Sequence, residues 1–204
     1  MQTQQASTGR RKRMSRAERE QQILAVAEEV FAADGYQATS MDDIAARVGL
    51  SKPMLYEYFG SKEGLLLACL KRCKRELIEA STVAAAGAES PEQLMYNCLL
   101  AFFKFGDEHA QAWALLRNEA AVPSASVSSE LEAIRLQQRD FTSGLLKAAR
   151  PDLDHEQLEA FAEAIIGACE RLALWREQRP EVTPEKATEH LMTLFAPSLT
   201  QNLR

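Results

Sequence analysis

Residues 40–59 read Ser40-Met-Asp-Asp-Ile-Ala-Ala-Arg-Val-Gly-Leu-Ser-Lys-Pro-Met-Leu-Tyr-Glu-Tyr-Phe59, and they carry the strongest structural signal in the chain. The spacing of apolar residues predicts two short helices, Met41–Val48 and Lys52–Phe59, on either side of Gly49. Gly49 can adopt the positive φ angle that a tight turn between them needs. Two short helices joined in this way form a helix-turn-helix.

The apolar side chains of this segment fall on the inner faces of the two helices. Ala45 is small enough to let the second helix cross the first closely. Ser51 stands where a capping residue is expected at the start of the second helix. The residues that we expect to build the motif are Ile44, Ala45, Val48, Leu50, Leu55 and Phe59.

The outer face of the second helix has the composition of a surface that reads the major groove of DNA. Residues near the start of such a helix reach base edges, and its flanks meet phosphates. Lys52 could donate to guanine, and Pro53 and Met54 could pack on thymine methyl groups. The acidic Asp42 and Glu57 are expected either to reject wrong sequences or to point away. The predicted DNA contacts are Thr39, Ser40, Ser51, Lys52, Pro53, Met54, Tyr56, Tyr58 and Lys62.

Several elements at matching spacing resemble the N-terminal signature of the TetR family of bacterial regulators. The elements are Thr39-Ser-x-x-x-Ile-Ala, Gly49, Ser51-Lys, Leu55-Tyr-x-Tyr-Phe and Ser61-Lys-Glu-Gly-Leu-Leu66. They cover about Arg16 to Leu67, roughly a quarter of the chain. The resemblance implies a DNA-binding regulator in which Ser40, Lys52, Pro53, Met54, Tyr56, Tyr58 and Lys62 fall on positions that commonly touch DNA.

The rest of the chain predicts an all-α fold, because β-branched residues are sparse and no long apolar/polar alternation appears. Capping pairs at Ser15 with Glu18, Ser90 with Gln93 and Asp154 with Gln157 mark helix starts. Three parts are expected: a basic flexible arm (1–15), a DNA-binding three-helix module (16–76), and a larger helical bundle for ligand binding and dimerisation (77–204). The further predicted helices are Arg16–Ala33, Lys62–Ala80, Pro91–Asp107, Ala110–Ala120, Ser126–Ala149, His155–Gln178 and Pro184–Asn202.

The charge is distributed unevenly along the chain. The net charge of −5 alone argues against a protein that binds nucleic acid. Residues 1–76, however, hold 13 Lys and Arg against 10 Asp and Glu, and residues 77–204 hold 11 against 19. The first sixteen residues have five basic and no acidic side chains, which suits either an arm that neutralises phosphates or a solvated tail. The N-terminal part is therefore the one that suits a polyanion.

The last two long helices offer a predicted dimer interface. They carry more apolar surface than one partner needs, and the resemblance implies that the last two long helices pair into a four-helix interface. A homodimer would read two half-sites of a palindromic double-stranded DNA operator. The residues predicted for the interface are Leu158, Phe161, Ala162, Ile165, Ile166, Cys169, Leu172, Leu191, Leu194, Phe195 and Leu199.

Aromatic side chains gather in the middle helices, where the resemblance implies an effector cavity. We expect a small, mostly apolar effector to enter the bundle and release a repressor from its operator. A plain aromatic core is the alternative. The residues predicted for the pocket are Tyr96, Phe102, Phe103, Phe105, Trp113, Leu116, Arg117, Phe141, Glu170 and Trp175.

Other classes of function have weaker support. A helical adaptor that binds only protein would explain the acidic C-terminal part but not Ser51 to Lys62. A cysteine-based redox sensor would use Cys69 and Cys73, which share a helix face, although buried structural thiols are the simpler explanation. No motif surrounds a nucleophile, so no catalytic residue, cofactor or metal is predicted. No run of apolar residues reaches the length of a membrane span and no secretory signal stands out, so we expect a cytoplasmic protein.

Overall fold

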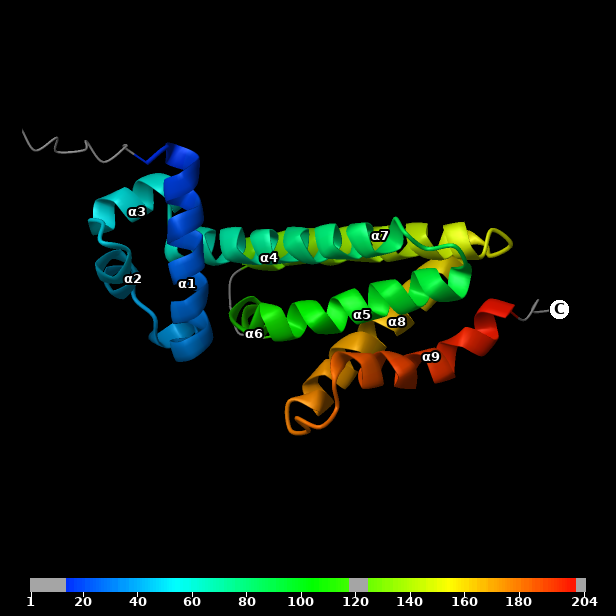
Figure 1. Ribbon diagram of the computed structural model, residues 1–204. Helices are drawn as coiled ribbons and strands as arrows, with labels where there is room; N and C mark the ends of the chain where they lie inside the picture. The colour runs from blue at the N-terminus through cyan, green and yellow to red at the C-terminus, as the bar shows by residue number, and fades with distance from the viewer. Residues whose placement is uncertain (1–13, 118–124, 201–204) are drawn as a thin grey trace, which may run out of the picture.

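The computed structural model describes the backbone of residues 14–117 and 125–200, and the side chains of residues 112, 115–117, 125–127 and 196–200 fall outside the description. Every regular element in these ranges is an α-helix, which confirms the predicted all-α fold (Figure 1). No helix among them is long and apolar enough to cross a membrane. The elements are α1 (Arg16–Ala38), α2 (Met41–Val48), α3 (Lys52–Phe59), α4 (Lys62–Ala85), α5 (Pro91–Glu108), α6 (Ala110–Arg117), α7 (Ala125–Ala149), α8 (His155–Arg176) and α9 (Pro184–Thr200).

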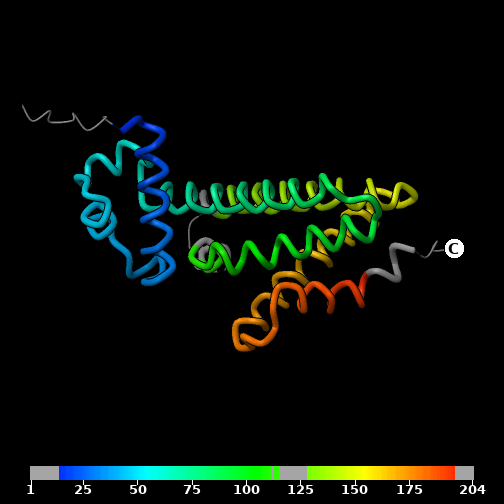
Figure 2. Tube along the Cα trace, viewed as in Figure 1, coloured from blue at the N-terminus to red at the C-terminus, as the bar shows by residue number. Residues whose placement is uncertain are grey.

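The helices form a small N-terminal module and a larger bundle. Helices α2 and α3 lie at the end of the molecule remote from the C-terminus, and α4 passes from that end into the bundle as one unbroken helix (Figures 1 and 2). Helix α4 packs against α5 and α7, α5 packs against α9, and α7 packs against α8. Helix α1 contacts both α4 and α6, so the N-terminal module rests directly on the bundle.

The predicted capping pairs begin their helices as expected. Ser15 and Glu18 form a capping box at the start of α1, with each side chain bonded to the other residue's backbone N–H. Asp154 and Gln157 do the same for α8, and the Ser90 hydroxyl accepts the backbone N–H three residues further on in α5. These bonds satisfy N–H groups that a helix leaves without an intrahelical partner.

Helix α1 departs from its predicted end. The sequence places its end at Ala33, and the helical segment extends to Ala38 across a break at Gly35. Gly35 has a φ of 77° and a ψ of 160°, a conformation that residues with a Cβ rarely adopt. The prediction therefore located the interruption correctly but missed the turn of helix that follows it.

Helix α4 runs five residues beyond the predicted end at Ala80, because the polar residues there do not break it. The Thr82 hydroxyl donates to the Ile78 carbonyl at 2.7 Å, so its side chain is satisfied inside the helix. The predicted division of the chain at residue 76 falls within this helix. Helices α5, α7 and α8 begin and end within two residues of their predicted bounds, and the predicted ends of α6 (Ala120) and α9 (Asn202) lie outside the described residues.

A continuous apolar core joins the two parts of the molecule. The predicted inner stripe of α1 is fully buried and packs against α4, and the same cluster extends to Leu99 and Phe103 of α5. The predicted basic arm lies almost entirely outside the described residues. The buried stripe of α1 consists of Ile23, Leu24, Ala27, Val30 and Phe31.

Candidate DNA-binding interface

Helices α2 and α3 form the helix-turn-helix, and its scaffold residues are buried as predicted. Gly49 ends α2 in the left-handed region, with a φ of 75° and a ψ of 35°. The Leu50 N–H then donates to the Ala45 carbonyl at 3.0 Å, which closes the turn. Leu55, on the inner face of α3, is inaccessible to solvent. Ile44, Ala45 and Val48 are buried, and Leu50 and Phe59 are half-buried against the same core.

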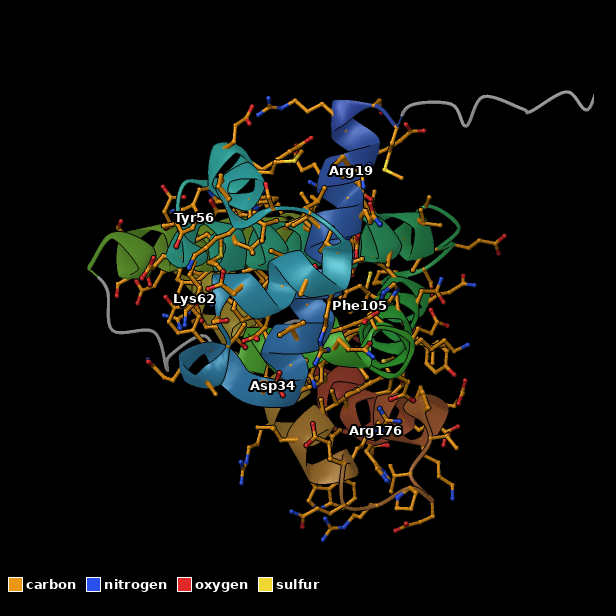
Figure 3. All side chains as sticks on the ribbon, turned by 90° about the vertical axis from the view of Figure 1, so that its left-hand side faces the viewer. Arg19, Asp34, Tyr56, Lys62, Phe105 and Arg176 are labelled. Carbon is orange, nitrogen blue, oxygen red and sulfur yellow. The ribbon has the colours of Figure 1, made fainter. Side chains whose placement is uncertain are left out.

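The outer face of α3 is open to solvent. Lys52, Pro53, Met54 and Tyr56 are all exposed. Met54 and Tyr56 are large side chains that keep 38% and 42% of their surface accessible, which no packing within this chain requires. Figure 3 looks onto this end of the molecule and shows Tyr56 on it. The face predicted to read base edges is therefore available to a partner.

Lys52 does not stand alone on this face. Its Nζ atom lies 2.7 Å from Oδ2 of Asp42, so an ion pair links the start of α3 to the start of α2. The hydrogen bond to Asp42 raises the pKa of Lys52. Asp42 is predicted to reject wrong sequences or to point away from DNA, and in the structure it accepts a hydrogen bond from Lys52, the predicted base-reading cation.

Thr39 has to be removed from the predicted DNA contacts. Only 3% of its surface is exposed, and its hydroxyl donates to the Gly35 carbonyl at 2.8 Å. Ser40 is half-buried, and its hydroxyl donates to the Asp43 carboxylate at 2.6 Å while it accepts the Asp43 N–H at 3.1 Å. These hydroxyls hold the junction of α1 and α2 together, because they satisfy backbone and side-chain groups there.

Lys62 also has a structural role that the sequence did not reveal. Its ammonium donates to the carbonyls of Tyr36 and Thr39, both at 2.8 Å, and lies 4.3 Å from the centre of the Tyr36 ring. Burial raises the pKa of Tyr36 to about 12, and Glu63 accepts a hydrogen bond from its hydroxyl. Lys62 therefore fastens the end of α1 to the start of α4, a structural role that comes in addition to the phosphate contact predicted for it.

Two further positions frame α3. Ser51 occupies the N-cap position, but its side chain makes no capping hydrogen bond, which corrects the capping role given to it. Tyr58 is half-buried, and the Arg16 guanidinium lies 4.9 Å from the centre of its ring. Arg16 is an exposed cation beside the recognition helix that was missed as a candidate contact. The position of Arg16 at the start of α1, directly after the basic arm, was the sequence feature that could have identified it as a candidate contact.

The bundle contains an elongated cavity between α4, α5, α7 and α8. Most of its lining is aliphatic, and the polar contributions come from Lys74, Ser81, Gln138 and Thr142. Of the residues predicted for an effector pocket, only Phe102 and Phe141 line this cavity. Its other walls include Ile165, Ile166 and Cys169, which were predicted for the dimer interface.

The other predicted pocket residues lie elsewhere. Phe103 and Trp113 line a separate depression between α5, α6, α8 and α9. The Phe102 ring makes edge contacts to both, with centroid distances of 5.3 and 5.1 Å. Phe105 is buried, Tyr96 is half-buried, and Glu170 and Trp175 are exposed. The side chains of Leu116 and Arg117 lie outside the described residues.

Helices α8 and α9 carry four large apolar side chains that are exposed on the single chain. Phe161, Leu174, Trp175 and Leu194 are 37%, 36%, 39% and 66% exposed, and Leu174 was not among the predicted interface residues. The predicted set needs correction, because four of its members pack inside the single chain. The buried members are Leu158, Ala162, Cys169 and Leu191, the half-buried members are Ile165, Ile166, Leu172 and Phe195, and the Leu199 side chain lies outside the described residues.

The cysteines show none of the features of reactive thiols. Cys69 and Cys73 are completely buried, and burial raises the pKa of each, to about 12 for Cys73. A thiol is reactive as the thiolate, which such burial disfavours. Within the described ranges, no three His, Cys, Asp or Glu residues lie together in a way that could hold a metal ion. The redox-sensor alternative therefore gains no support.

An exposed helix presented by a buried helix-turn-helix scaffold defines a DNA-binding protein of the helix-turn-helix class. The profile described as "Bacterial regulatory proteins, tetR family" matches residues 23–69, and that described as "Tetracyclin repressor-like, C-terminal domain" matches residues 91–197. The second match alone covers more than half of the chain. The chain belongs to the TetR family of bacterial transcription regulators, which confirms the resemblance noted in the sequence.

Individual relatives agree with this assignment. The HTH-type transcriptional activator FasR of Mycolicibacterium smegmatis is 36% identical over 120 residues, which span 59% of this chain and 55% of FasR. The crystal structure of a TetR-like regulator from Rhodococcus sp. RHA1 is 32% identical, covers 93% of this chain and 100% of its own, and has a TM-score of 0.73. FadR of Bacillus subtilis, solved with stearoyl-CoA, shares the fold alone, with 16% identity, coverage of 89% and 99%, and a TM-score of 0.75.

Proposed function

We propose that this regulator binds a palindromic DNA operator as a homodimer and that an apolar effector in the bundle cavity controls the binding. The observation that carries the proposal is the exposed outer face of α3 on a helix-turn-helix whose inner residues are buried or half-buried. The N-terminal 76 residues also carry the positive excess of the chain. Both features suit docking of α3 in the major groove, where phosphates surround the helix.

On this proposal the residues of the interface divide by chemistry. Lys52, Pro53 and Met54 stand at the start of α3 and meet base edges, because that end of a recognition helix enters the groove. Tyr56 follows on the same exposed face and donates its hydroxyl to a phosphate. Arg16 approaches from the side through its contact with Tyr58 and supplies a further cation to the backbone.

The second half-site requires a second subunit. The exposed side chains of Phe161, Leu174, Trp175 and Leu194 give α8 and α9 an apolar surface that a copy of the same chain would bury. Helices α8 and α9 also pack against each other within the chain, so the surface has a firm base. A two-fold dimer through this surface would pair four helices, as in helical bundles.

The cavity between α4, α5, α7 and α8 is the proposed effector site. Helix α4 forms one of its walls and also begins beside the helix-turn-helix, at the Lys62 contacts with the end of α1. A ligand that prefers one position of α4 would thereby shift the population of DNA-binding conformations. FadR, which shares the fold, is described in complex with stearoyl-CoA, and the aliphatic lining here suits a ligand with an apolar chain.

We further propose that the protein represses transcription by occupying its operator and that the effector releases it. FasR is named an activator, so the direction of regulation is the part to test in a reporter assay. Expression of the protein should lower the output of a promoter that contains the selected operator. A rise in output would reverse the sign while leaving the DNA-binding proposal intact.

Selection of bound duplexes from a random pool, followed by mobility shifts at increasing salt, tests the DNA-binding proposal. The selected sites should show two inverted half-sites about one or two helical turns apart, in multiples of roughly 34–36 Å. The affinity should fall steeply with salt because bound phosphates release counterions. Failure of every duplex to bind, with the protein shown to be folded, would remove the proposed function.

A further inference from the structure

The side chain of Ser81 lines the bundle cavity among mostly aliphatic residues. It is half-buried, and its hydroxyl makes no hydrogen bond with any residue that the structure describes. The backbone carbonyl of Ser81 accepts from Sγ of Cys98 at 3.8 Å, and that contact leaves the hydroxyl unused. A hydroxyl can donate one hydrogen bond and accept two, so Ser81 can bind a polar atom of a ligand.

The other polar side chains of the lining are engaged within the chain. The Thr142 hydroxyl donates to the backbone carbonyl of Gln138 at 3.0 Å. Lys74 donates to the Gln138 side chain and has a further interaction in the protein. None of the side chains that line the cavity within the described ranges is an Asp or a Glu. A charged group brought from water into these surroundings carries a large penalty unless it finds its own counter-charge, so the lining favours an uncharged ligand.

Ser81 lies about halfway along the cavity. The first lining residue of α4 is Lys74, seven residues before Ser81, which corresponds to about 10 Å at 1.5 Å per helical residue. Helix α5 runs back alongside α4, and its Cys98 lies beside Ser81 (Figure 1). The first lining residue of α5 is Pro91, seven residues before Cys98 and again about 10 Å away. The cavity wall therefore extends for a similar distance on either side of the Ser81 hydroxyl.

Both halves of the cavity have apolar walls. Leu77 and Phe102 line the half that lies toward the helix-turn-helix, and Leu94 and Ala149 line the other half. An extended hydrocarbon chain, with bonds of about 1.5 Å and angles near 111°, advances by about 1.25 Å per bond. Each half is therefore long enough for an apolar chain of about eight carbon atoms.

We infer that the cavity takes an uncharged ligand with a hydroxyl or carbonyl group in the middle of an apolar chain, and that Ser81 binds this group. The inference rests on the proposed function, since it names the chemical class of the effector. Secondary alcohols, ketones and esters have this pattern. The Ser81 hydroxyl donates to the oxygen of the ligand, and the two arms of the chain cover the apolar walls on either side. A polar group at the end of the chain either misses Ser81 or leaves half of the cavity unfilled.

Binding of three ligands that share an eleven-carbon chain tests this assignment with the full-length protein. Undecan-6-ol, its isomer undecan-1-ol and undecanoic acid are titrated calorimetrically below their solubility limits at pH 7.5. Undecan-6-ol should bind about fivefold more tightly than undecan-1-ol, which is the effect of one hydrogen bond. The ionised acid should bind less tightly than either alcohol. Undecan-1-ol or the acid binding as tightly as undecan-6-ol would overturn the inference, as would absence of binding by undecan-6-ol.

Variants localise the effect to Ser81. Ser81→Ala removes only the hydroxyl, so the two alcohols should bind it equally, and Ser81→Thr should keep the preference for undecan-6-ol. Thr82→Val is the matched control, because the adjacent Thr82 is exposed and its hydroxyl donates to the Ile78 carbonyl of its own helix. Persistence of the full preference in a folded Ser81→Ala would contradict the assignment. Should Ser81→Ala fail to fold, the comparison of the two isomers on the unmodified protein still decides.

A mobility shift with the selected operator separates this inference from the proposed function. Preference for undecan-6-ol without any change in operator affinity would support the assignment of Ser81 and remove effector control from the proposed function. Equal binding of the two alcohols, with operator release by both, would support effector control and overturn the assignment of Ser81. Failure of the protein to bind any duplex would concern the helix-turn-helix and leave the calorimetric comparison valid.

Discussion

Lys52 and Asp42 connect the two helices of the helix-turn-helix through an ion pair with 2.7 Å between Nζ and Oδ2. Both side chains are exposed, by 46% and 64%, so water screens the attraction and the pair can open when a phosphate or a base competes. In the absence of DNA, the ion pair holds the Lys52 side chain toward Asp42. On the proposed binding mode, Asp42 also places a negative charge near the DNA phosphates.

Asp42→Asn should therefore strengthen binding to unrelated duplexes more than binding to the operator. The released ammonium becomes available to any phosphate, and the plot of log affinity against log salt should steepen by about 0.9 for unrelated DNA. Fluorescence anisotropy of both duplexes across a range of salt concentrations measures the effect. Glu57→Gln is the control, since it removes an exposed acid of α3 and leaves the pair in place. Identical behaviour of the two variants would argue against a role for the pair.

Lys62→Met should lower the stability of the folded protein as well as its affinity for DNA. The substitution leaves the Tyr36 and Thr39 carbonyls without their ammonium donor, at a cost of about 1–3 kcal/mol. Urea unfolding followed by circular dichroism measures the loss. Tyr56→Phe, at an exposed position of α3, should weaken DNA binding without a comparable loss of stability. If Lys62→Met matched Tyr56→Phe in stability, Lys62 would serve DNA alone.

Arg72→Met should destabilise the interface between α1 and α4. Arg72 contacts the Glu28 carboxylate, and the two side chains are only 12% and 8% exposed. Removing one partner of a buried ion pair leaves a buried charge and costs about 3–5 kcal/mol. Urea unfolding at pH 7.5 should show this loss, and Arg75→Met, at an exposed position of the same helix, should show little change.

The loss caused by Arg72→Met should also depend on pH. Burial raises the pKa of Glu28 above its ordinary value of 4.5, and the Arg72 contact opposes that shift. A raised carboxyl pKa means that the folded state binds a proton more readily than the unfolded state, so stability falls as the pH rises above 4.5. Without Arg72 the shift grows, and the difference from the unmodified protein should be smaller at pH 5 than at pH 7.5. If Arg72→Met lost the same free energy of unfolding at pH 5 and at pH 7.5, Glu28 would remain ionised in the variant or would turn out to solvent.

Phe161→Glu combined with Leu194→Glu should convert the protein to a monomer. Both side chains are exposed on the single chain, by 37% and 66%, so the fold should persist. Loss of the second half-site should weaken operator binding by about 100-fold or more. Light scattering during size exclusion measures the mass, with Val83→Glu, on the 77% exposed Val83 of α4, as the control. A double variant that remains dimeric would move the interface away from this surface.

The scaffold of the DNA-binding module could be predicted from sequence because its determinants are local. The spacing of Ile44, Ala45, Val48 and Leu55 determines which side of each short helix is buried. Gly49 sits where the turn requires a positive φ angle, and it has one of 75°. These features depend on neighbours a few residues away, which the sequence displays directly.

The roles of Thr39 and Lys62 could not be predicted in the same way. They depend on the turn of helix after Gly35, which brings the Tyr36 carbonyl to an ammonium 26 residues away in the chain. The sequence indicated a hydroxyl and a cation near a helix start, which is equally the description of a phosphate site. Only the tertiary arrangement shows that protein carbonyls accept from these groups.

The cavity was predicted from the aromatic residues in the middle helices. Composition does not show toward which neighbouring helix each aromatic side chain points. Phe102, Phe103 and Phe105 are neighbours in sequence, yet successive residues of a helix point about 100° apart. Phe102 therefore lines both the cavity and the other depression, whereas Phe103 lines the depression and not the cavity. The lining is mostly aliphatic because α4 and α7 present leucine and isoleucine there. A single sequence did not indicate which faces of four helices would meet.

Helix α4 connects the helix-turn-helix module to the cavity in the bundle. Its 24 residues extend for about 36 Å at 1.5 Å per residue, from the module that meets DNA to the far end of the cavity. A tilt of about 5° about one end displaces the other end by about 3 Å, a distance comparable to a hydrogen bond. A ligand in the cavity need not reshape the helix-turn-helix at all. A small tilt of an intact α4 would change the separation of the two α3 helices in a dimer. That separation would then no longer match the distance between successive major grooves of DNA.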